Sequence, residues 1–344
     1  MPTTDRHRSR TPGRPRRRDE AGRARGWVLL AGVTAAAVAG LLLVRLGAGP
    51  FPDPEGCTAQ VAGTSVDLSL EQAQNATLIA AIGVQRGLPA RAVSIALATA
   101  FQESKLVNID YGDRDSLGLF QQRPSQGWGT PAQVQDPVYA TNAFYDALVE
   151  VEGYRDLRIT EAAQAVQRSG FPEAYEQHAE GARALASALT GYSPGAFSCV
   201  VDRPEGPRQE MGENGLTPRA DGVRRDLEIA FGDLSLGGFA PGGVSTGHQE
   251  GSTHYDGRAI DVFFRPVTDQ ARREGWAMAH YLQAHAGRLG VQYVIWDDRI
   301  WSTGYRSQQG WRDYRAPVDD ATPADTRAIL EHRDHVHVDV VEGG

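Results

Sequence analysis

Two pairs of polar residues in the C-terminal part of the chain have the types and spacing of metal ligands. His254 and Asp261 are seven positions apart, and His335 and His337 are separated by one valine. Imidazole nitrogens and carboxylate oxygens bind divalent metal ions, and three such ligands with a fourth position open to water are typical of catalytic zinc. Neither cysteine of the chain lies in this part of the sequence, which excludes a thiolate structural site. The pattern predicts a catalytic zinc site.

The elements expected to position these residues are short strands. Three runs rich in β-branched and aromatic residues are expected strands: 258–264, 291–296 and 335–340. A helix is expected over about 269–286, between the first two runs. In the last run the valines form one face, so His335, His337 and Asp339 lie on the other, and Asp261 meets them if the strands are neighbours. This predicts an α+β domain with a small antiparallel sheet.

A second candidate site, in the first half of the chain, rests on one carboxylate. Glu103 follows an apolar stripe of helical spacing that includes Val93, Leu97 and Phe101. Desolvation beside an apolar core raises the pKa of a carboxylic acid. A general acid that cleaves a glycosidic bond must be protonated near neutral pH. Taken alone, Glu103 also fits a solvated surface residue.

The sequence around Glu103 resembles the lysozyme-like lytic transglycosylases. The pair Glu103-Ser104 and the run SLGLFQ at 116–121 carry the resemblance, which spans roughly 70–177. It implies a mainly helical, lysozyme-like domain in which Glu103 is the sole acid and base. It also implies that Ser104 and Gln121 contribute to glycan binding.

One segment departs from that family. The family's Ala-Tyr-Asn-Ala-Gly segment corresponds here to AVQRSG at 165–170, so the family tyrosine is missing. Gln167 stands where the family has asparagine, and Tyr175 is a candidate to supply the ring. Hydrolysis, lytic cyclisation and glycan binding without cleavage all remain open.

The C-terminal motifs resemble those of the zinc peptidases grouped with lysostaphin, the D-alanyl-D-alanine carboxypeptidases and the hedgehog signalling domain. The run Ser252–Asp261 matches the whole motif Ser-x-His-x-x-Gly-x-Ala-x-Asp, and a terminal His-x-His follows. The resemblance spans roughly 217–340. The runs YVIW at 293–296 and RIWS at 299–302 look like the branch of this family found in actinobacterial exported proteins. The resemblance implies three zinc ligands: His254, Asp261 and His337. It also implies that His335 stabilises the transition state or moves protons.

Three further positions bear on this second resemblance. Some relatives place a glutamate base three residues before the last ligand, where this chain has the shorter Asp334. Relatives often carry an arginine for the substrate carboxylate after the first core strand, where this chain has GFAPG at 238–242. Endopeptidase action is therefore favoured over carboxypeptidase action. His248 lies outside the motif and is interpreted as a loop residue.

The charge distribution limits the class of partner. The chain has 344 residues, long enough for two domains with attachments, and a formal net charge of −8. Residues 1–26 hold nine arginines and three acidic residues, a charge of +6, so the total of −8 leaves −14 for the rest. An acidic body does not suit phosphate contacts, so no nucleic-acid partner is expected.

A membrane anchor is expected directly after this basic arm. Residues 27–44 carry no charge over 18 positions, about the length that crosses a bilayer core as a helix. We expect an anchor over 27–46, with the arginine-rich N-terminus cytoplasmic and the later domains extracellular. A cleaved signal remains an alternative.

The two cysteines, Cys57 and Cys199, bracket the first domain and are expected to form a disulfide. The expected order is a basic arm, a transmembrane anchor, a spacer, a lysozyme-like domain, a linker and a zinc-peptidase domain: 1–26, 27–46, 47–62, 63–199, 200–216 and 217–344.

The sequence thus predicts a multidomain fold, with an N-terminal transmembrane helix, a mainly α lysozyme-like domain and an α+β zinc-peptidase domain. The expected function is that of a membrane-anchored peptidoglycan hydrolase, a lytic transglycosylase or muramidase joined to a zinc metallopeptidase. The alternative is a wall-binding scaffold whose lysozyme-like domain holds glycan without cutting it. In that case only the peptidase domain, or neither domain, is active.

Overall fold

The computed structural model describes residues 54–344, and their first elements are strands rather than a spacer. Strands β1 (Gly56–Val61) and β2 (Thr64–Leu68) form an antiparallel hairpin. Its two turn residues, Ala62 and Gly63, both have positive φ, as the tightest hairpin turns require. Strand β3 (Phe197–Val200) pairs with the other edge of β1, so the sheet has the order β2-β1-β3.

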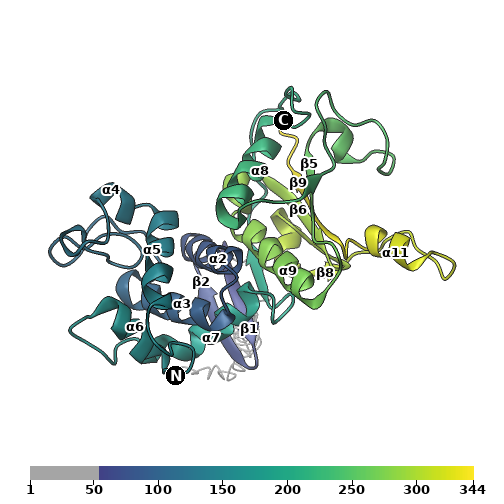
Figure 1. The fold of residues 1–344 in the computed structure, drawn as a ribbon. Coiled ribbons are helices and arrows are strands. Elements are labelled where there is room, and N and C mark those ends of the chain that lie inside the picture. The colour runs from purple at the N-terminus through teal and green to yellow at the C-terminus, as the bar shows by residue number, and fades with distance from the viewer. Residues whose placement is uncertain (1–53) are drawn as a thin grey trace, which may run out of the picture. The chain divides into compact units, whose positions relative to one another are not determined.

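Helices account for most of the chain between β2 and β3 (Figure 1). They are α2 (Leu70–Gln85), α3 (Ala90–Ser104), α4 (Pro131–Val134), α5 (Pro137–Val149), α6 (Ile159–Gln167) and α7 (Ala179–Leu189). Helix α2 begins with a capping box, because Ser69 accepts from the Gln72 amide and the Gln72 side chain accepts from the Ser69 amide. Helix α3 ends where Lys105 takes the left-handed conformation, so Glu103 lies in its last turn.

The C-terminal part contains a six-stranded antiparallel sheet of order β4-β5-β9-β6-β7-β8. Its strands are β4 (Leu236–Gly237), β5 (Ala259–Phe263), β6 (Val291–Trp296), β7 (Arg299–Ser302), β8 (Arg312–Asp313) and β9 (His335–Val340). The accompanying helices are α8 (Pro218–Phe231), α9 (Asp269–Ala284), α10 (Ala286–Leu289) and α11 (Ala324–Leu330). Helices α8 and α9 pack against the sheet (Figure 1), and the three strands that carry or flank the predicted ligands are adjacent.

The fold class predicted from the sequence is wrong in two respects. Within residues 54–344, no helix is both long enough and apolar enough to cross a membrane. The segment 27–46, on which the predicted anchor rested, lies outside the described residues, and the single-pass membrane location expected from it is contradicted with it. The structure shows a mixed α/β protein with two antiparallel sheets, because the hairpin that replaces the expected spacer adds a sheet to the helical part.

The helical part and the C-terminal part belong to one compact unit and are joined by buried contacts. The Trp301 indole donates a hydrogen bond to the Cys199 carbonyl at 3.0 Å. The Trp311 indole donates to the Phe197 carbonyl at 3.1 Å. Helix α2 also packs against α9. Val201, the second residue of the predicted linker, is buried with this core; the expected domain boundaries themselves stay a prediction.

The predicted disulfide is confirmed. Cys57 on β1 and Cys199 on β3 are directly opposite each other and bonded, at a sequence separation of 142. Both side chains are buried. The bond therefore closes a loop that contains every helix from α2 to α7.

Loss of the disulfide is expected to destabilise the protein by about 4 kcal/mol, because a cross-link over so long a loop restricts the unfolded chain. Denaturant unfolding of the oxidised protein, the reduced protein and a Cys57→Ala/Cys199→Ala variant measures this. The variant should match the reduced protein and should not respond to reductant. An equal unfolding midpoint for oxidised and reduced protein would contradict the expectation.

Candidate metal centre and candidate acid site

Three side chains from separate elements converge on one point in the C-terminal part. Asp261 on β5 is directly opposite His337 on β9, and His254 precedes β5 in a short 3₁₀ turn capped by the Ser252 hydroxyl. His254 Nε2 lies 3.1 Å from His337 Nδ1 and 3.3 Å from Asp261 Oδ1. His337 Nδ1 lies 2.9 Å from Asp261 Oδ1. All three residues are buried.

These distances fit a bound metal ion. Ligand atoms at 2.0–2.1 Å from a tetrahedral ion are about 3.3 Å from one another, close to the separations found here. Burial raises the pKa of Asp261, but hydrogen bonds with His254 and His337 lower it well below its ordinary range. Asp261 is therefore held in its ionised form, as a metal ligand would need to be. The three residues form a candidate metal-binding site.

The ring of His254 is held by the backbone. Its Nδ1 donates to the Gly238 carbonyl at 2.8 Å, which leaves Nε2 for the site. Gly238 has φ +80, and a Cβ there would come within 2.2 Å of His254 Cε1. Only glycine fits at this close approach. Relatives often carry an arginine at this position. Here the backbone of Gly238 packs against His254 instead.

His335 lies beside the three candidate ligands, and Asp334 contacts the ring nitrogen that faces away from them. Its Nε2 is 3.7 Å from Asp261 Oδ1, and its Nδ1 contacts Asp334 Oδ1 at 2.7 Å. Asp334 Oδ2 accepts from Arg265 at 2.6 Å. Burial raises the pKa of Asp334, but these hydrogen bonds with His335 and Arg265 lower it below its ordinary value. Strand β9 begins after Asp334, which frees this carboxylate from the strand alternation.

His248 is part of the same cluster, although the sequence indicated only a loop residue. Its ring stacks on His254 with centroids 3.8 Å apart. His248, His254 and Asp261 each offer a ligand atom within 4.8 Å of the others. Tyr255 clamps the loop, accepting from the His248 amide and donating to its carbonyl. A histidine six positions before His254 in a Gly- and Ser-rich loop has no periodic signal, so spacing does not find it.

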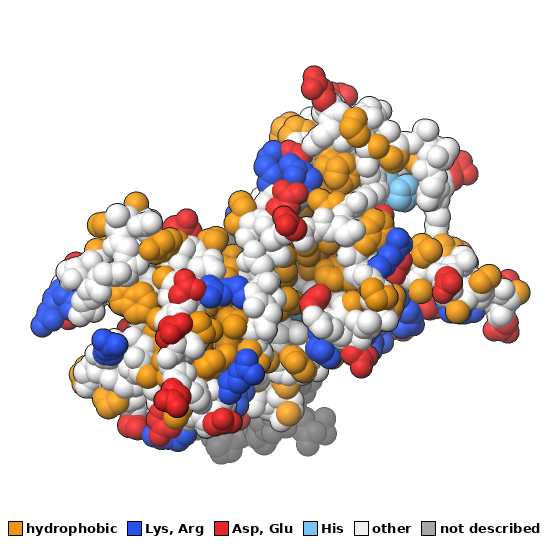
Figure 2. All heavy atoms as spheres, in the orientation of Figure 1, with side chains coloured by type: hydrophobic (Ala, Val, Ile, Leu, Met, Phe, Trp, Pro, Cys, Tyr) orange, Lys and Arg blue, Asp and Glu red, His pale blue; other side chains and the backbone are white. Residues whose placement is uncertain are grey.

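A cavity of 240 Å³ opens above these residues. Its lining includes His248, His254, Asp261, His335 and His337, together with Tyr293, Tyr314 and His332. Figure 2 shows histidine atoms at the surface of the C-terminal part, with acidic and basic side chains interspersed over the same face of the molecule.

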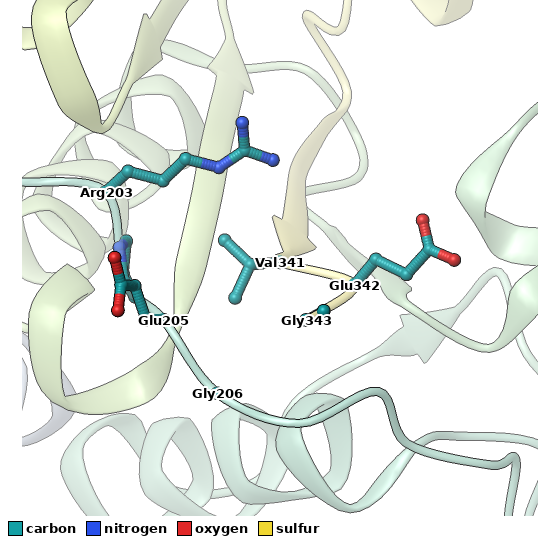
Figure 3. Close-up of a pocket in the computed structure, with 8 residues that line it drawn as sticks. Arg203, Glu205, Gly206, Val341, Glu342 and Gly343 are labelled. Carbon is teal, nitrogen blue, oxygen red and sulfur yellow. The ribbon is translucent and has the colours of Figure 1, made fainter.

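A larger cavity lies elsewhere and gathers no comparable groups. It has a volume of 590 Å³ and lies between residues 203–206 and residues 341–344 (Figure 3). Its charged residues are Arg203, Glu205 and Glu342, and the two carboxylates point away from each other in Figure 3. Size alone therefore does not mark the functional site.

The acid site brings together three of the residues predicted for it. Tyr175, fully buried, donates its hydroxyl to Glu103 Oε1 at 2.8 Å. Burial raises the pKa of Glu103 above its ordinary value, and hydrogen bonds from Tyr175 and Gln167 partly oppose that rise. Gln167 also donates to the Phe120 carbonyl at 2.7 Å, which ties α6 to the turn that follows α3.

Ser104 and Gln121, the other two residues predicted for this site, have their polar groups engaged within the protein. The Ser104 hydroxyl donates to the Leu119 carbonyl at 2.7 Å and is buried. The Gln121 amide donates to the carbonyls of Tyr111 and Gly118. Both side chains therefore donate hydrogen bonds to the turn at 118–121.

Part of the chain is similar to a known protein family. Residues 212–324 match the family model described as "VldE, C-terminal domain". This segment is about a third of the chain; it contains His248, His254 and Asp261 and ends before His335 and His337. No curated protein matches the chain.

Replacing Tyr175 with phenylalanine is expected to raise the pKa of Glu103 further. The hydroxyl donates to the carboxylate and so stabilises its ionised form, and its loss favours the protonated form. Titration of the Glu103 carboxyl carbon by NMR measures the change.

The matched control is Tyr111→Phe, which removes an exposed hydroxyl. It should leave the titration of Glu103 where it is in the unaltered protein. A lower pKa for Glu103 in Tyr175→Phe would contradict the assigned contact.

Proposed function

We propose that the C-terminal part is a zinc-dependent peptidase. The observation that supports this best is the convergence of His254, Asp261 and His337, with their ligand atoms 2.9–3.3 Å apart, beneath an open cavity. The donors are nitrogen and oxygen, three in number, as in catalytic zinc sites. Both cysteines are used in the disulfide, so neither is a ligand.

Bound zinc would supply Lewis acidity towards a substrate carbonyl and lower the pKa of a water molecule. His335 would hold or donate a proton at Nε2, which faces the ligands. Asp334 would orient that ring by accepting from Nδ1, and Arg265 would keep Asp334 ionised. In this scheme Asp334 is a positioning residue, and His335 is the group nearest the chemistry.

The substrate we propose is the peptide stem or cross-link of peptidoglycan. The complete motif over Ser252–Asp261 resembles wall-cutting zinc peptidases, and a lysozyme-like motif lies in the same chain. Endopeptidase cleavage is favoured, because the backbone of Gly238 packs on His254 where an arginine for a terminal carboxylate is often found.

A second activity, cleavage of glycan strands, is favoured by the environment of Glu103. Its raised pKa suits a general acid that protonates a leaving sugar oxygen. The segment 165–170 has no tyrosine where the resembled family has one, and Tyr175 supplies an aromatic hydroxyl to Glu103 instead. Either hydrolysis or lytic cyclisation follows from one carboxylate in this role.

The rival function is glycan binding without cleavage. Ser104 and Gln121 use their polar groups within the protein, so these groups are not free to hold a sugar for cleavage by Glu103. A protein of this kind would retain peptidoglycan and release no sugar fragments. The variants below separate the possibilities.

His337→Ala is expected to abolish both zinc binding and peptide cleavage, because it removes one of three converging ligands. Zinc content by elemental analysis and release of peptides from peptidoglycan measure the two effects. His178→Ala, which changes a histidine in the helical part, is the matched control. Full zinc content in His337→Ala would remove His337 from the ligand set.

Glu103→Gln is expected to lower the rate of glycan cleavage by about 10²–10⁴-fold, the usual contribution of a general acid. Glutamine keeps the shape and cannot donate the proton. Mass spectrometry of fragments released from peptidoglycan gives the rate, and peptide cleavage should not change.

Glu152→Gln, at an exposed position, controls for the loss of a carboxylate elsewhere in the helical part. Unchanged sugar products from Glu103→Gln would exclude Glu103 from the chemistry. If the unaltered protein binds glycan strands and releases no fragments, the binding function is correct.

A further inference from the structure

Asp339 is a fully buried carboxylate without a hydrogen-bond partner among the described residues. Its exposed fraction is 0%, and neither carboxylate oxygen has a partner. Burying a carboxylate is costly unless it is paired, so an isolated one in a central strand calls for a specific cause. The sequence placed Asp339 on the face of His337 and assigned it no role.

The sheet places Asp339 directly behind the metal centre. On β9 it is two residues from His337 and shares its face. It is opposite the small side chain of Ala259 on β5 and opposite Tyr293 on β6. Its Oδ2 lies 3.6 Å from His337 Nε2. Two proton-bearing rings therefore face this carboxylate: the imidazole of His337 and the phenol of Tyr293, whose pKa is raised by burial and by Asp339.

The two nitrogens of His337 face different partners. Nδ1 is directed at His254 and Asp261, where the ion would lie, and Nε2 is directed at Asp339. A neutral imidazole carries one proton, so a ring that binds metal through Nδ1 carries it on Nε2. That proton needs an acceptor.

The other two histidines follow the same pattern. His254 turns Nδ1 to the Gly238 carbonyl, and His335 turns Nδ1 to Asp334. Each ring thus presents one nitrogen to the centre and the other to an acceptor that sets its orientation. Asp339 completes the set for His337, whose acceptor is otherwise missing.

We propose that Asp339 positions His337 for metal binding: its carboxylate accepts the Nε2 proton, fixes the tautomer and directs Nδ1 to the ion. The partners of the two outer carboxylates support this arrangement. Asp334 is paired with Arg265, whereas among the described residues only the His337 ring lies within ion-pair distance of Asp339. This inference rests on the metal site of the proposed function.

The test is the affinity of the full chain for Zn²⁺ alone, measured by competition with a chromophoric chelator. Asp339→Asn keeps the size of the side chain and removes its charge. We expect it to weaken zinc binding by about 10- to 100-fold, the usual effect of losing such a partner. Asp226→Asn, which changes a carboxylate held by Arg288 and Tyr281, is the matched control and should bind as the unaltered protein does.

The outcomes separate this inference from the proposed function. Absence of zinc binding by the unaltered protein would overturn both. Zinc binding by the unaltered protein and equally by folded Asp339→Asn would overturn the role of Asp339 alone. A merely structural role would lower the unfolding midpoint of the metal-free variant without changing its zinc affinity.

A measurement on the unaltered protein covers the case in which the variant does not fold. In ¹⁵N-histidine NMR spectra of the zinc-bound form, the His337 signals are assigned by their loss in His337→Gln. We expect Nδ1 to shift on zinc binding and Nε2 to carry a proton that exchanges slowly with water. Zinc bound through Nε2, or a rapidly exchanging Nε2 proton, would overturn the proposal.

Discussion

The register of β9 between β5 and β6 is the constraint on which the candidate metal centre depends. It sets Asp261 opposite His337 and turns His335, His337 and Asp339 to one face of the sheet. A shift of one residue would turn all three to the other face, because side chains alternate along a strand. The valines between them pack in the core on the opposite face, so burial of those valines and assembly of the site are achieved by the same pairing.

Both candidate sites place a titratable group at the edge of an apolar core and hold it with one outer partner. Glu103 ends a helix whose other face is buried, and Tyr175 donates to it. His335 begins a buried strand, and Asp334 holds its ring. At Glu103 burial raises the pKa of the carboxyl group, and the hydrogen bond from Tyr175 opposes part of that rise. At His335 the partner sets the orientation of the ring.

The helical part and the C-terminal part, which carry these two sites, pack directly against each other. Strand β3, which holds one end of the disulfide, also accepts hydrogen bonds from Trp301 and Trp311 through its backbone. The disulfide thus connects the first sheet to a strand that the C-terminal part contacts directly. Strand β3 therefore joins the first sheet to the C-terminal core through both the disulfide and these hydrogen bonds.

Local chemistry determined much of the candidate metal centre from the sequence alone. The ligand types, the strands β6 and β9 and the alternation that groups His335 with His337 are all properties of short stretches. Only the tertiary structure decided that His248 joins the cluster and that Arg265 holds Asp334. It also decided the first sheet, because its outer strand pairs with residues some 140 positions away. Such pairings depend on burial and register across the whole fold, which no local pattern encodes.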